Sequence, residues 1–468
     1  MRYKAILALT LAGFLSSCAL YTSPKNVKVQ IPSEFKYTIN STNSTLSQNW
    51  WENFKDKTLN NVVKTALENN LNYKIALKNI QIAQTYVGQN QSALLPTINA
   101  TYSSTRNKPS LNQSPSALNS SNKIYNLHQA GLSASYELDV WHQIQNSVNQ
   151  AKANVNLSQA DANVVKLTLL SNVAQTYFQL AALNLSIENF TNQLKSAEEI
   201  LKLNEDKYKS GLINIEPIED AKTQVENIKT VLNNLIKQKQ ITQNTLAYYL
   251  GKYPEDFSIK PSSNNFDLQN YAELIPPQVP STVLTQRPDV KEAMYNVLSY
   301  AYAQKQALAN FFPVFNLTAN YGYASTNLSS FIENASNVWN FGLNILAPIF
   351  NYKKNTSIYE RSKLQYEQAV LNYRNTVINA FKEVDSALAS YKKDNEALLS
   401  YQKNYQSAKN LFDIYKAQYE AGTVDYITYL NYKINLLNAQ YNLINQNLLV
   451  REDVINIYNA LGMGLSSD

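Results

Sequence analysis

The fold is decided by a heptad pattern in the second half of the chain, where residues 384–422 are VDSALASYKKDNEALLSYQKNYQSAKNLFDIYKAQYEAG. Apolar or aromatic residues recur at every seventh position from Val370 to Tyr419, and the same spacing runs from Val173 to Tyr208. Heptads sustained over this length predict coiled-coil-like packing of helices over about 142–209 and about 352–420. Each helix would be about 100 Å long at ~1.5 Å per residue, whereas a helix of an ordinary globular domain averages about 11 residues.

Both long helices lead into the same short motif, which is KYKSG at 207–211 and QYEAG at 418–422. The glycines predict left-handed helix caps, followed by shorter helices over about 215–250 and 424–461. Upstream, ALLP at 93–96 corresponds to FFP at 311–313. The chain is therefore a tandem duplication of helical hairpins. We expect the first repeat over 49–250, an aperiodic linker over 251–280, the second repeat over 281–464 and a tail over 465–468.

Four segments between the helices are rich in β-formers and partly alternate, and they predict strands over about 97–104, 130–141, 314–325 and 338–350. A tilted membrane strand needs about ten residues. Four strands cannot close a transmembrane barrel, since known barrels begin at about eight strands, and lipid does not tolerate an open sheet edge. A membrane sheet would therefore require an oligomer. The alternative is a soluble four-stranded sheet that caps a helical bundle.

The N-terminus has the features of a secretory leader. Arg2 and Lys4 precede an apolar run at 5–15 that is too short to span a bilayer. The following Leu-Ser-Ser-Cys, at 15–18, resembles a bacterial lipobox. We expect a signal peptide over 1–17, lipidation of Cys18 and a tether over 18–48, and Ala19 favours an outer-membrane destination. The alternative is that Cys18 is a buried structural cysteine.

Composition argues for an ordered protein that is not an enzyme. The 468 residues are 44% hydrophobic and 16% charged, with only 10 Gly, 2 His and 1 Cys, a poor supply for catalytic or metal sites. His128 and His142 stand at predicted strand ends, without a cysteine or a patterned carboxylate nearby in the sequence, so we expect no metal or cofactor. A net charge of +6 is too small to indicate a nucleic-acid partner.

The order and duplication of several motifs resemble the TolC-type outer-membrane factors, in particular the OprM- and NodT-like lipoprotein branch. The resemblance covers about Trp50 to Gly464. The matching motifs are YELDVW at 136–141, LG at 250–251 with Pro254, PS at 280–281 through RPDV at 287–290, APIF at 347–350, Tyr419 with Gly422, LL-x-AQ at 436–440 and YNALG at 458–462.

The resemblance implies a mainly α fold with a membrane β part. Three chains would combine their four strands each into one twelve-stranded outer-membrane β-barrel, and the duplicated helical hairpins would form a periplasmic α-barrel. The implied function is the exit duct of a tripartite pump that exports drugs or other small toxic compounds. Its partners would be a periplasmic adaptor, an inner-membrane transporter of RND, MFS or ABC type, and outer-membrane lipid. The alternatives are a type I secretion channel for proteins and a non-conducting coiled-coil scaffold lipoprotein.

The resemblance also places a periplasmic gate at the hairpin tips. A salt bridge that joins the hairpins in the family is missing here, because Pro217, Val424, Thr428 and Asn431 stand at the positions of the residues that form it. Asp220 keeps a carboxylate at the gate, and the Asp220 residues of three chains would form a ring that favours cations. The alternative is that Asp220 is only a first-turn acid stabilised by the helix dipole. Glu216, Glu219 and Asp425 would contact the adaptor or act only as helix N-terminal acids. The implied gate positions are Tyr208, Gly211, Asp220, Tyr419, Gly422, Thr428 and Asn431.

Overall fold

The computed structural model describes residues 32, 34–37, 49–108, 124–261, 274–275 and 281–464. Cys18, the expected signal peptide over 1–17, most of the expected tether and the tail over 465–468 lie outside these residues. The described chain forms two compact units. The first contains Asn79–Ser158 and Glu292–Tyr373, and the second contains the described residues of Val29–Lys78, Gln159–Lys291 and Arg374–Asp468.

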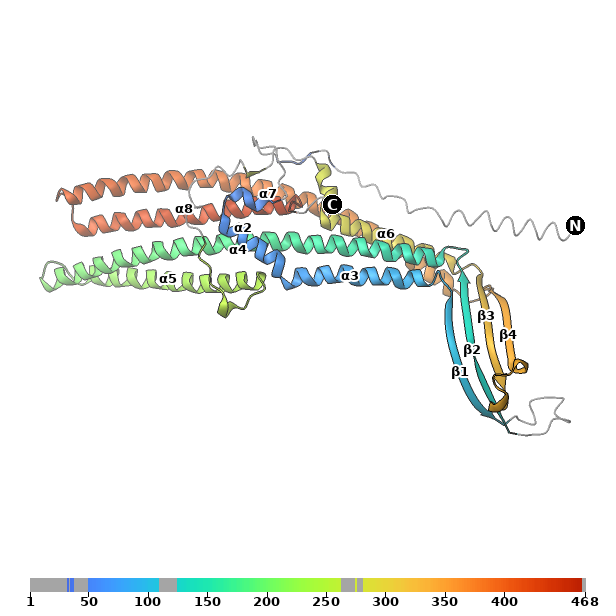
Figure 1. Cartoon of the computed structure of the whole chain (residues 1–468). Coiled ribbons are helices and arrows are strands. Elements are labelled where there is room, and N and C mark those ends of the chain that lie inside the picture. Colours follow the sequence, from blue (N-terminus) through green and yellow to red (C-terminus); the bar gives the residue numbers. More distant parts are fainter. Residues whose placement is uncertain are drawn as a thin grey trace. The chain divides into compact units, whose positions relative to one another are not determined.

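The first unit holds a four-stranded antiparallel sheet in the order β1-β2-β3-β4 (Figure 1). Because β1 and β4 stand at the ends of this order, each pairs with one neighbour in the chain. The strands have 10 to 14 residues, the length that a tilted membrane strand needs. They are β1 (Thr97–Asn107), β2 (Tyr125–Leu138), β3 (Val314–Ser325) and β4 (Asn337–Leu346).

The strand register gives the sheet one apolar and one polar face, since side chains alternate between the faces along each strand. Ala134 lies opposite Ala319, which lies opposite Phe341, whereas Ser133 lies opposite Asn320, which lies opposite Asn340. Asn320 Nδ2 donates a 2.8 Å hydrogen bond to Asn340 Oδ1 on the polar face. The apolar face also carries Ile98, Tyr102, Leu132, Phe315, Leu317, Tyr321, Trp339, Leu343 and Ile345, and the polar face Thr97, Asn99, Thr101, Ser135, Glu137, Asn316, Thr318 and Asn344.

Two strands end earlier than the sequence predicted. The second strand covers 125–138 rather than 130–141, because the Asp139 carboxylate accepts hydrogen bonds from the backbone N–H groups of Ile144 (2.9 Å) and Gln145 (2.7 Å) at the start of the next helix. The fourth strand covers 337–346 rather than 338–350, and Pro348, which has no N–H to donate, lies two residues beyond its end. The first strand, in contrast, extends three residues further, to Asn107.

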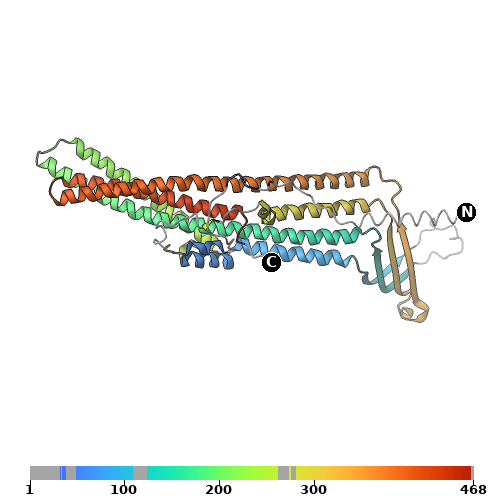
Figure 2. The same ribbon diagram turned by 90° about the horizontal axis from the view of Figure 1, so that it is seen from above.

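Four helical segments of the first unit lie side by side (Figure 2). They belong to α3 (Leu71–Ser92), α4 (Gln143–Lys209), α6 (Pro288–Ala309) and α7 (Lys354–Glu420). Polar side chains join them, and hydrogen bonds run from Ser147 Oγ to Asn90 Oδ1 (2.5 Å), from Ser299 Oγ to Asn154 Oδ1 (2.7 Å) and from Gln306 Nε2 to Gln150 Oε1 (2.8 Å).

The second unit contains two helical hairpins, which are α4 with α5 (Glu216–Tyr249) and α7 with α8 (Tyr426–Ala460). The α4 and α7 helices have 67 residues each, matching the duplication seen in the sequence. The smaller helices are α2 (Lys57–Asn69), whose N-terminus is capped by Asp56, and the 3-10 helices η2 (Trp50–Phe54), η3 (Pro254–Asp256) and η6 (Ser281–Gln286). Trp50 stacks on Tyr458 of α8 with ring centroids 5.2 Å apart. Within the described residues, no helix has both the length and the apolar character needed to cross a membrane.

A buried arginine of the second unit joins the first residues of α6 to α7 and α8. The side chain of Arg287, at the start of α6, is 7% exposed. It donates to Asp289, to the Ala460 carbonyl at the end of α8 and, at 2.7 Å, to Glu383 of α7. These bonds join residues that are up to 173 positions apart, so Arg287 fixes the start of α6 against both helices of the second hairpin.

Candidate gate at the hairpin tips

The two hairpins turn at their tips by the same backbone motif. Gly211 and Gly422 have φ angles of +70° and +72°, so both predicted left-handed caps are confirmed. Gly211 N–H donates to the Tyr208 carbonyl at 2.8 Å, and Gly422 N–H donates to the Tyr419 carbonyl at 2.9 Å. A Cβ atom at either glycine would meet nothing within 4 Å. Backbone conformation, and not packing, therefore requires glycine at these positions.

The tip of the first hairpin presents exposed carboxylates. Glu216 accepts a 3.1 Å hydrogen bond from Asn214 Nδ2, and Glu219 pairs with Lys222 at 2.8 Å. Asp220 is exposed at the start of α5, and Tyr208 is also exposed. The predicted acids thus lie together on the first turns of one helix, where the helix dipole favours negative charge.

The tip of the second hairpin is capped by Asp425, which precedes α8. Its Oδ1 accepts a 2.8 Å hydrogen bond from the backbone N–H of Thr428. This bond is the main reason that the pKa of the Asp425 carboxyl lies below its usual range. Thr428 is half-buried and Asn431 is exposed. Asp425 is thus the residue that caps the N-terminus of α8.

Aromatic side chains fill the space between the two helices of the second hairpin. The ring of Tyr419 lies 5.0 Å from that of Tyr426 and 5.3 Å from that of Tyr429, measured between centroids. Further along, Tyr415 stacks on Tyr432 at 3.5 Å. These aromatic pairs hold α7 against α8 at the tip, because aromatic pairs contribute beyond their buried area.

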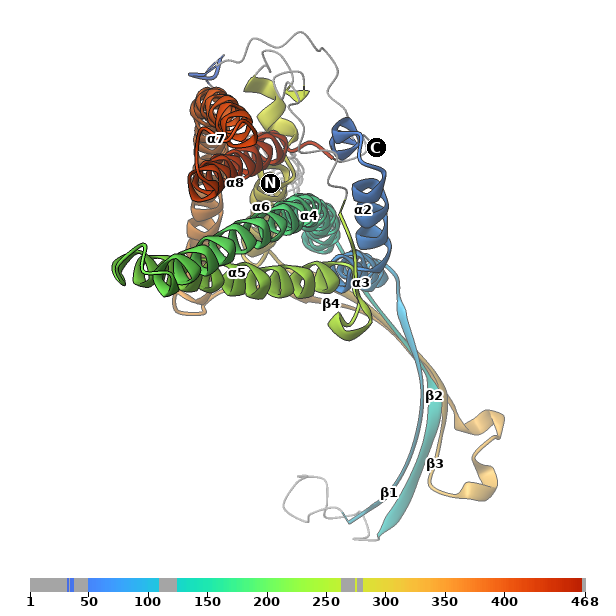
Figure 3. The same ribbon diagram turned by 90° about the vertical axis from the view of Figure 1, so that its left-hand side faces the viewer.

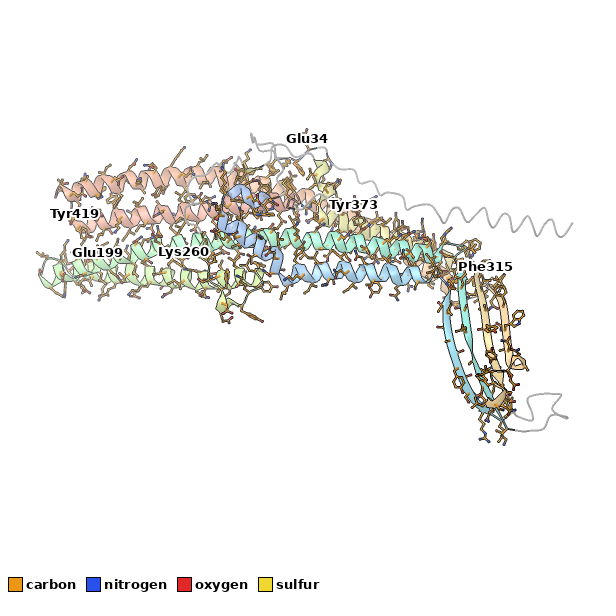
Figure 4. The ribbon with its side chains drawn as sticks, viewed as in Figure 1. Glu34, Glu199, Lys260, Phe315, Tyr373 and Tyr419 are labelled. Atoms are coloured by element: carbon orange, nitrogen blue, oxygen red, sulfur yellow. The ribbon has the colours of Figure 1, made fainter. Side chains whose placement is uncertain are left out.

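A hydrogen bond links the two hairpins near their tips. Tyr426 Oη on α8 donates to Glu199 Oε2 on α4 at 2.8 Å, and this bond to a carboxylate raises the pKa of Tyr426 to about 12. The Tyr426 phenol is therefore protonated at neutral pH and available as a donor. Figure 4 labels Glu199 on α4 and Tyr419 at the end of α7. No local sequence pattern indicates the Tyr426–Glu199 pair, because its residues are 227 positions apart and neither belongs to a recognisable motif.

A second contact between α4 and α8 lies further from the tips. Asn189 Nδ2 donates to the Leu437 carbonyl at 2.9 Å and to Gln440 Oε1 at 3.1 Å. Phe190 packs edge-on against Tyr441, with centroids 4.9 Å apart. A buried core of residues from α4, α5 and α8 lies in the same region, formed by Phe190, Ala197, Ile200, Ala221, Val225, Ile228, Leu430 and Ile434. The two hairpins are thus joined by an apolar core and by polar contacts at two positions along their length.

The described residues contain no group of three or more His, Cys, Asp and Glu side chains placed to hold a metal ion. His128 Nδ1 lies 3.0 Å from Ser104 Oγ on the neighbouring strand. His142 has a positive φ of 56° in the turn before α4.

Comparisons with known proteins identify relatives over almost the whole chain. The family model described as "Outer membrane efflux protein" matches residues 62–252 and 279–463. The pyoverdine export outer membrane protein OpmQ of Pseudomonas aeruginosa is 27% identical, over 100% of this chain and 98% of its own length. The probable outer membrane lipoprotein SilC of Salmonella typhimurium is 28% identical over 97% and 96% of the two chains. The crystal structure of the Campylobacter jejuni CmeC outer membrane channel matches with a TM-score of 0.82 and 28% identity, over 95% and 96%.

Proposed function

Because the chain belongs to the outer membrane efflux protein family, we propose that it is the outer-membrane exit duct of a tripartite efflux pump. The observation that carries this function is the combination of a two-faced sheet of membrane-length strands with two long helical hairpins in one chain. The sheet would carry the duct through the outer membrane and the hairpins would continue it through the periplasm. The duct itself would supply a path and no chemistry.

The proposed duct is a homotrimer. The β1 and β4 strands stand at the two ends of the sheet order, and a sheet in lipid must pair its edges. Pairing β4 of one chain with β1 of the next would close twelve strands from three chains. The apolar face, with Trp339, Phe341 and Leu343 exposed on β4, would then contact lipid. The polar face would line the channel, because membrane barrels alternate apolar-out with polar-in.

The proposed gate lies at the hairpin tips, and the Tyr426–Glu199 hydrogen bond is its closing link. This bond joins the first hairpin to the second at 2.8 Å and would take the place of the salt bridge that this chain lacks. The exposed Asp220 residues of three chains would line the constriction, and Glu216, Glu219 and Asp425 would be available for contact with a periplasmic adaptor. Opening would require the two hairpins to separate, with loss of the tyrosine–carboxylate bond.

The proposed location is the outer membrane, with the helices in the periplasm and a lipid anchor at Cys18. Support for the anchor comes from the lipobox-like sequence at 15–18 and from the relative described as a probable outer membrane lipoprotein. The periplasmic adaptor would connect the tips to an inner-membrane transporter of RND, MFS or ABC type. The cargo class we propose is small molecules, since one relative is described as a pyoverdine exporter.

The experiment that tests this function is deletion of the gene in its own host, followed by complementation with the wild-type chain. Greater retention of a fluorescent dye, with sensitivity to antibiotics, detergents or metals that complementation reverses, is the expected result. Unchanged retention together with loss of a secreted protein from the medium would instead identify a protein-export channel. Labelling of Cys18 by a radioactive fatty acid, absent in Cys18→Ser, tests the anchor separately.

A further inference from the structure

The connection between β3 and β4 is an ordered loop that lies against the apolar face of the sheet. Residues 326–336 have the sequence TNLSSFIENAS and contain two 3-10 turns, η7 (Leu328–Ser330) and η8 (Asn334–Ser336). Figure 3 shows this connection on the convex side of the bowed strands. It joins the strand ends that point away from the connections to the helices, so it lies at the outer end of the proposed duct.

One aromatic side chain fixes the loop to the sheet. The ring of Phe331 lies 6.4 Å from that of Tyr102 on β1, 6.4 Å from that of His128 on β2 and 6.5 Å from that of Tyr323 on β3, between centroids. By the strand register, Tyr102 pairs with Ala130 and Ala130 with Tyr323, while His128 stands two residues before Ala130. All three partners are therefore on the apolar face, and Phe331 holds the loop over three strands of that face.

Hydrogen bonds within the loop fix its shape. Ser336 Oγ donates to the Ser330 carbonyl at 2.7 Å, Ser330 Oγ lies 2.8 Å from Ser325 Oγ, and the backbone N–H of Asn327 donates to Ser325 Oγ at 3.1 Å. Asn337 Nδ2 also donates to the Gly322 carbonyl on β3 at 3.3 Å. The loop is thus built as a defined surface, in contrast to a flexible polar connection.

This surface exposes two large aliphatic side chains. Leu328 is 65% exposed and Ile332, next to the anchored Phe331, is 78% exposed. Aliphatic side chains of this kind are stabilised when they are removed from water, so a loop that holds both of them outward favours an apolar environment over water. The apolar face to which the loop is fixed continues below it through Tyr321 and Trp339, both exposed.

We propose that this loop is a lipid-contacting element, in which Leu328 and Ile332 enter the acyl-chain boundary of the outer leaflet while Phe331 anchors the loop to the membrane-facing side of the sheet. The inference rests on the proposed outer-membrane function, because it extends the lipid-facing surface from the strands onto the connection above them. Acyl chains are the occupant that fits, since the loop is continuous with a face of aromatic and aliphatic side chains. Tyr102, Tyr323 and Trp339 supply the aromatic residues typical of a membrane boundary.

The test uses the full-length trimer in phosphatidylcholine liposomes, with single cysteines that carry an environment-sensitive nitrobenzoxadiazole dye. The test position is Ile332→Cys, and the matched control is Asn334→Cys, an exposed polar position in the same loop. Phe341→Cys on the apolar face of β4 reports whether the sheet itself is in lipid. Wild-type protein, which has Cys18 only, gives the labelling background. Quenching is measured with aqueous iodide and with lipids brominated either near the headgroup or near the chain end.

We expect dye at 332 to emit at shorter wavelength than dye at 334, to resist iodide and to be quenched most by lipids brominated near the headgroup. Adding Phe331→Ala should return dye at 332 to the iodide sensitivity of dye at 334, because the loop loses its anchor. Iodide quenching at 332 as strong as at 334 would overturn the inference. Protection of the dye at 332 from iodide and from brominated lipids alike would also overturn it, because it would indicate a neighbouring chain as the occupant. If dye at 341 is not quenched by lipid either, the proposed membrane sheet fails as well.

Discussion

Tyr426 of α8 donates a 2.8 Å hydrogen bond to the carboxylate of Glu199 of α4, which joins the two helical hairpins near their tips. The donor ring also packs against Tyr419 and Tyr429. The link therefore consists of a directional bond set in an aromatic cluster. Because the ring and the hydroxyl can be separated by substitution, the contribution of each is accessible to experiment.

Tyr426→Phe should favour opening of the duct. A half-buried hydrogen bond to a charged acceptor contributes about 1 kcal/mol per chain, so its loss shifts the closed–open equilibrium roughly fivefold per chain. Single-channel recordings should show longer open times. Tyr429→Phe is the control, because it keeps an aromatic ring in the same cluster and the Tyr426–Glu199 bond. Identical recordings for Tyr426→Phe and wild type would remove this bond from the gate.

The same link should weaken at high pH. The pKa of Tyr426 is raised to about 12 from 10.0, so the folded chain keeps the phenol proton at a pH where the unfolded chain has lost it. The stabilisation is complete below pH 10 and declines as the pH rises toward 12. Open probability should therefore increase over this interval in wild type and stay flatter in Tyr426→Phe.

Gly422→Ala should destabilise the second hairpin tip by about 1 kcal/mol, because the φ of +72° is a left-handed conformation that a Cβ disfavours. The same change at Gly88, inside α3, should have the opposite sign and stabilise by about 0.5 to 1 kcal/mol, since alanine is the better helix former. Neither added Cβ would meet an atom within 4 Å, so packing does not confuse the comparison. Limited proteolysis and thermal unfolding give both values, and equal shifts would contradict the explanation.

Arg287→Ala should lower the free energy of unfolding by about 2 kcal/mol, because it removes the buried donor that satisfies the Ala460 carbonyl and pairs with Glu383. Lys393→Ala is the matched control. The Lys393–Glu396 pair has the same 2.7 Å separation as the Arg287–Glu383 pair, but the Lys393 side chain is 75% exposed, so its loss should change stability by less than about 0.5 kcal/mol. Denaturant unfolding of the reconstituted protein distinguishes the two.

Asp453 on α8 should make the helical part less stable as the pH rises from 4 to 7. Burial, the neighbouring charge of Asp394 on α7 and that of Glu452 raise the Asp453 pKa to about 7 from 3.8. The folded chain thus retains a proton that the unfolded chain releases near pH 4, and stability falls across this window. Asp453→Asn should flatten this slope in melting temperature and be relatively more stable at pH 8. An unchanged slope would exclude Asp453 as its source.

Asp220→Asn should reduce cation selectivity if three Asp220 carboxylates line the constriction, since acidic rings favour cations. Reversal potentials under a salt gradient measure this selectivity. Asp206→Asn is the control, because Asp206 is also an exposed acid of the first tip and its charge is paired with Lys209 at 3.5 Å. Selectivity equal to wild type in Asp220→Asn would leave Asp220 as an acid that only complements the helix dipole.

The sequence by itself determined the features that depend on local periodicity. The heptads gave the two 67-residue helices, the glycines at 211 and 422 gave the left-handed caps, and alternation gave four strands. The ends of the strands were predicted less accurately. The second strand ends where the Asp139 side chain accepts hydrogen bonds from the first turn of α4, and local periodicity does not reveal such a side-chain contact.

Tertiary structure alone decided which distant residues meet. Glu199 meets Tyr426 across 227 positions, Arg287 meets Glu383 across 96, and Phe331 folds back over Tyr102 on β1. A heptad or an alternating pattern specifies which face of an element is apolar, but not which neighbour covers that face. The partner depends on how helices and strands pack, and packing is set by contacts between segments that no local pattern contains.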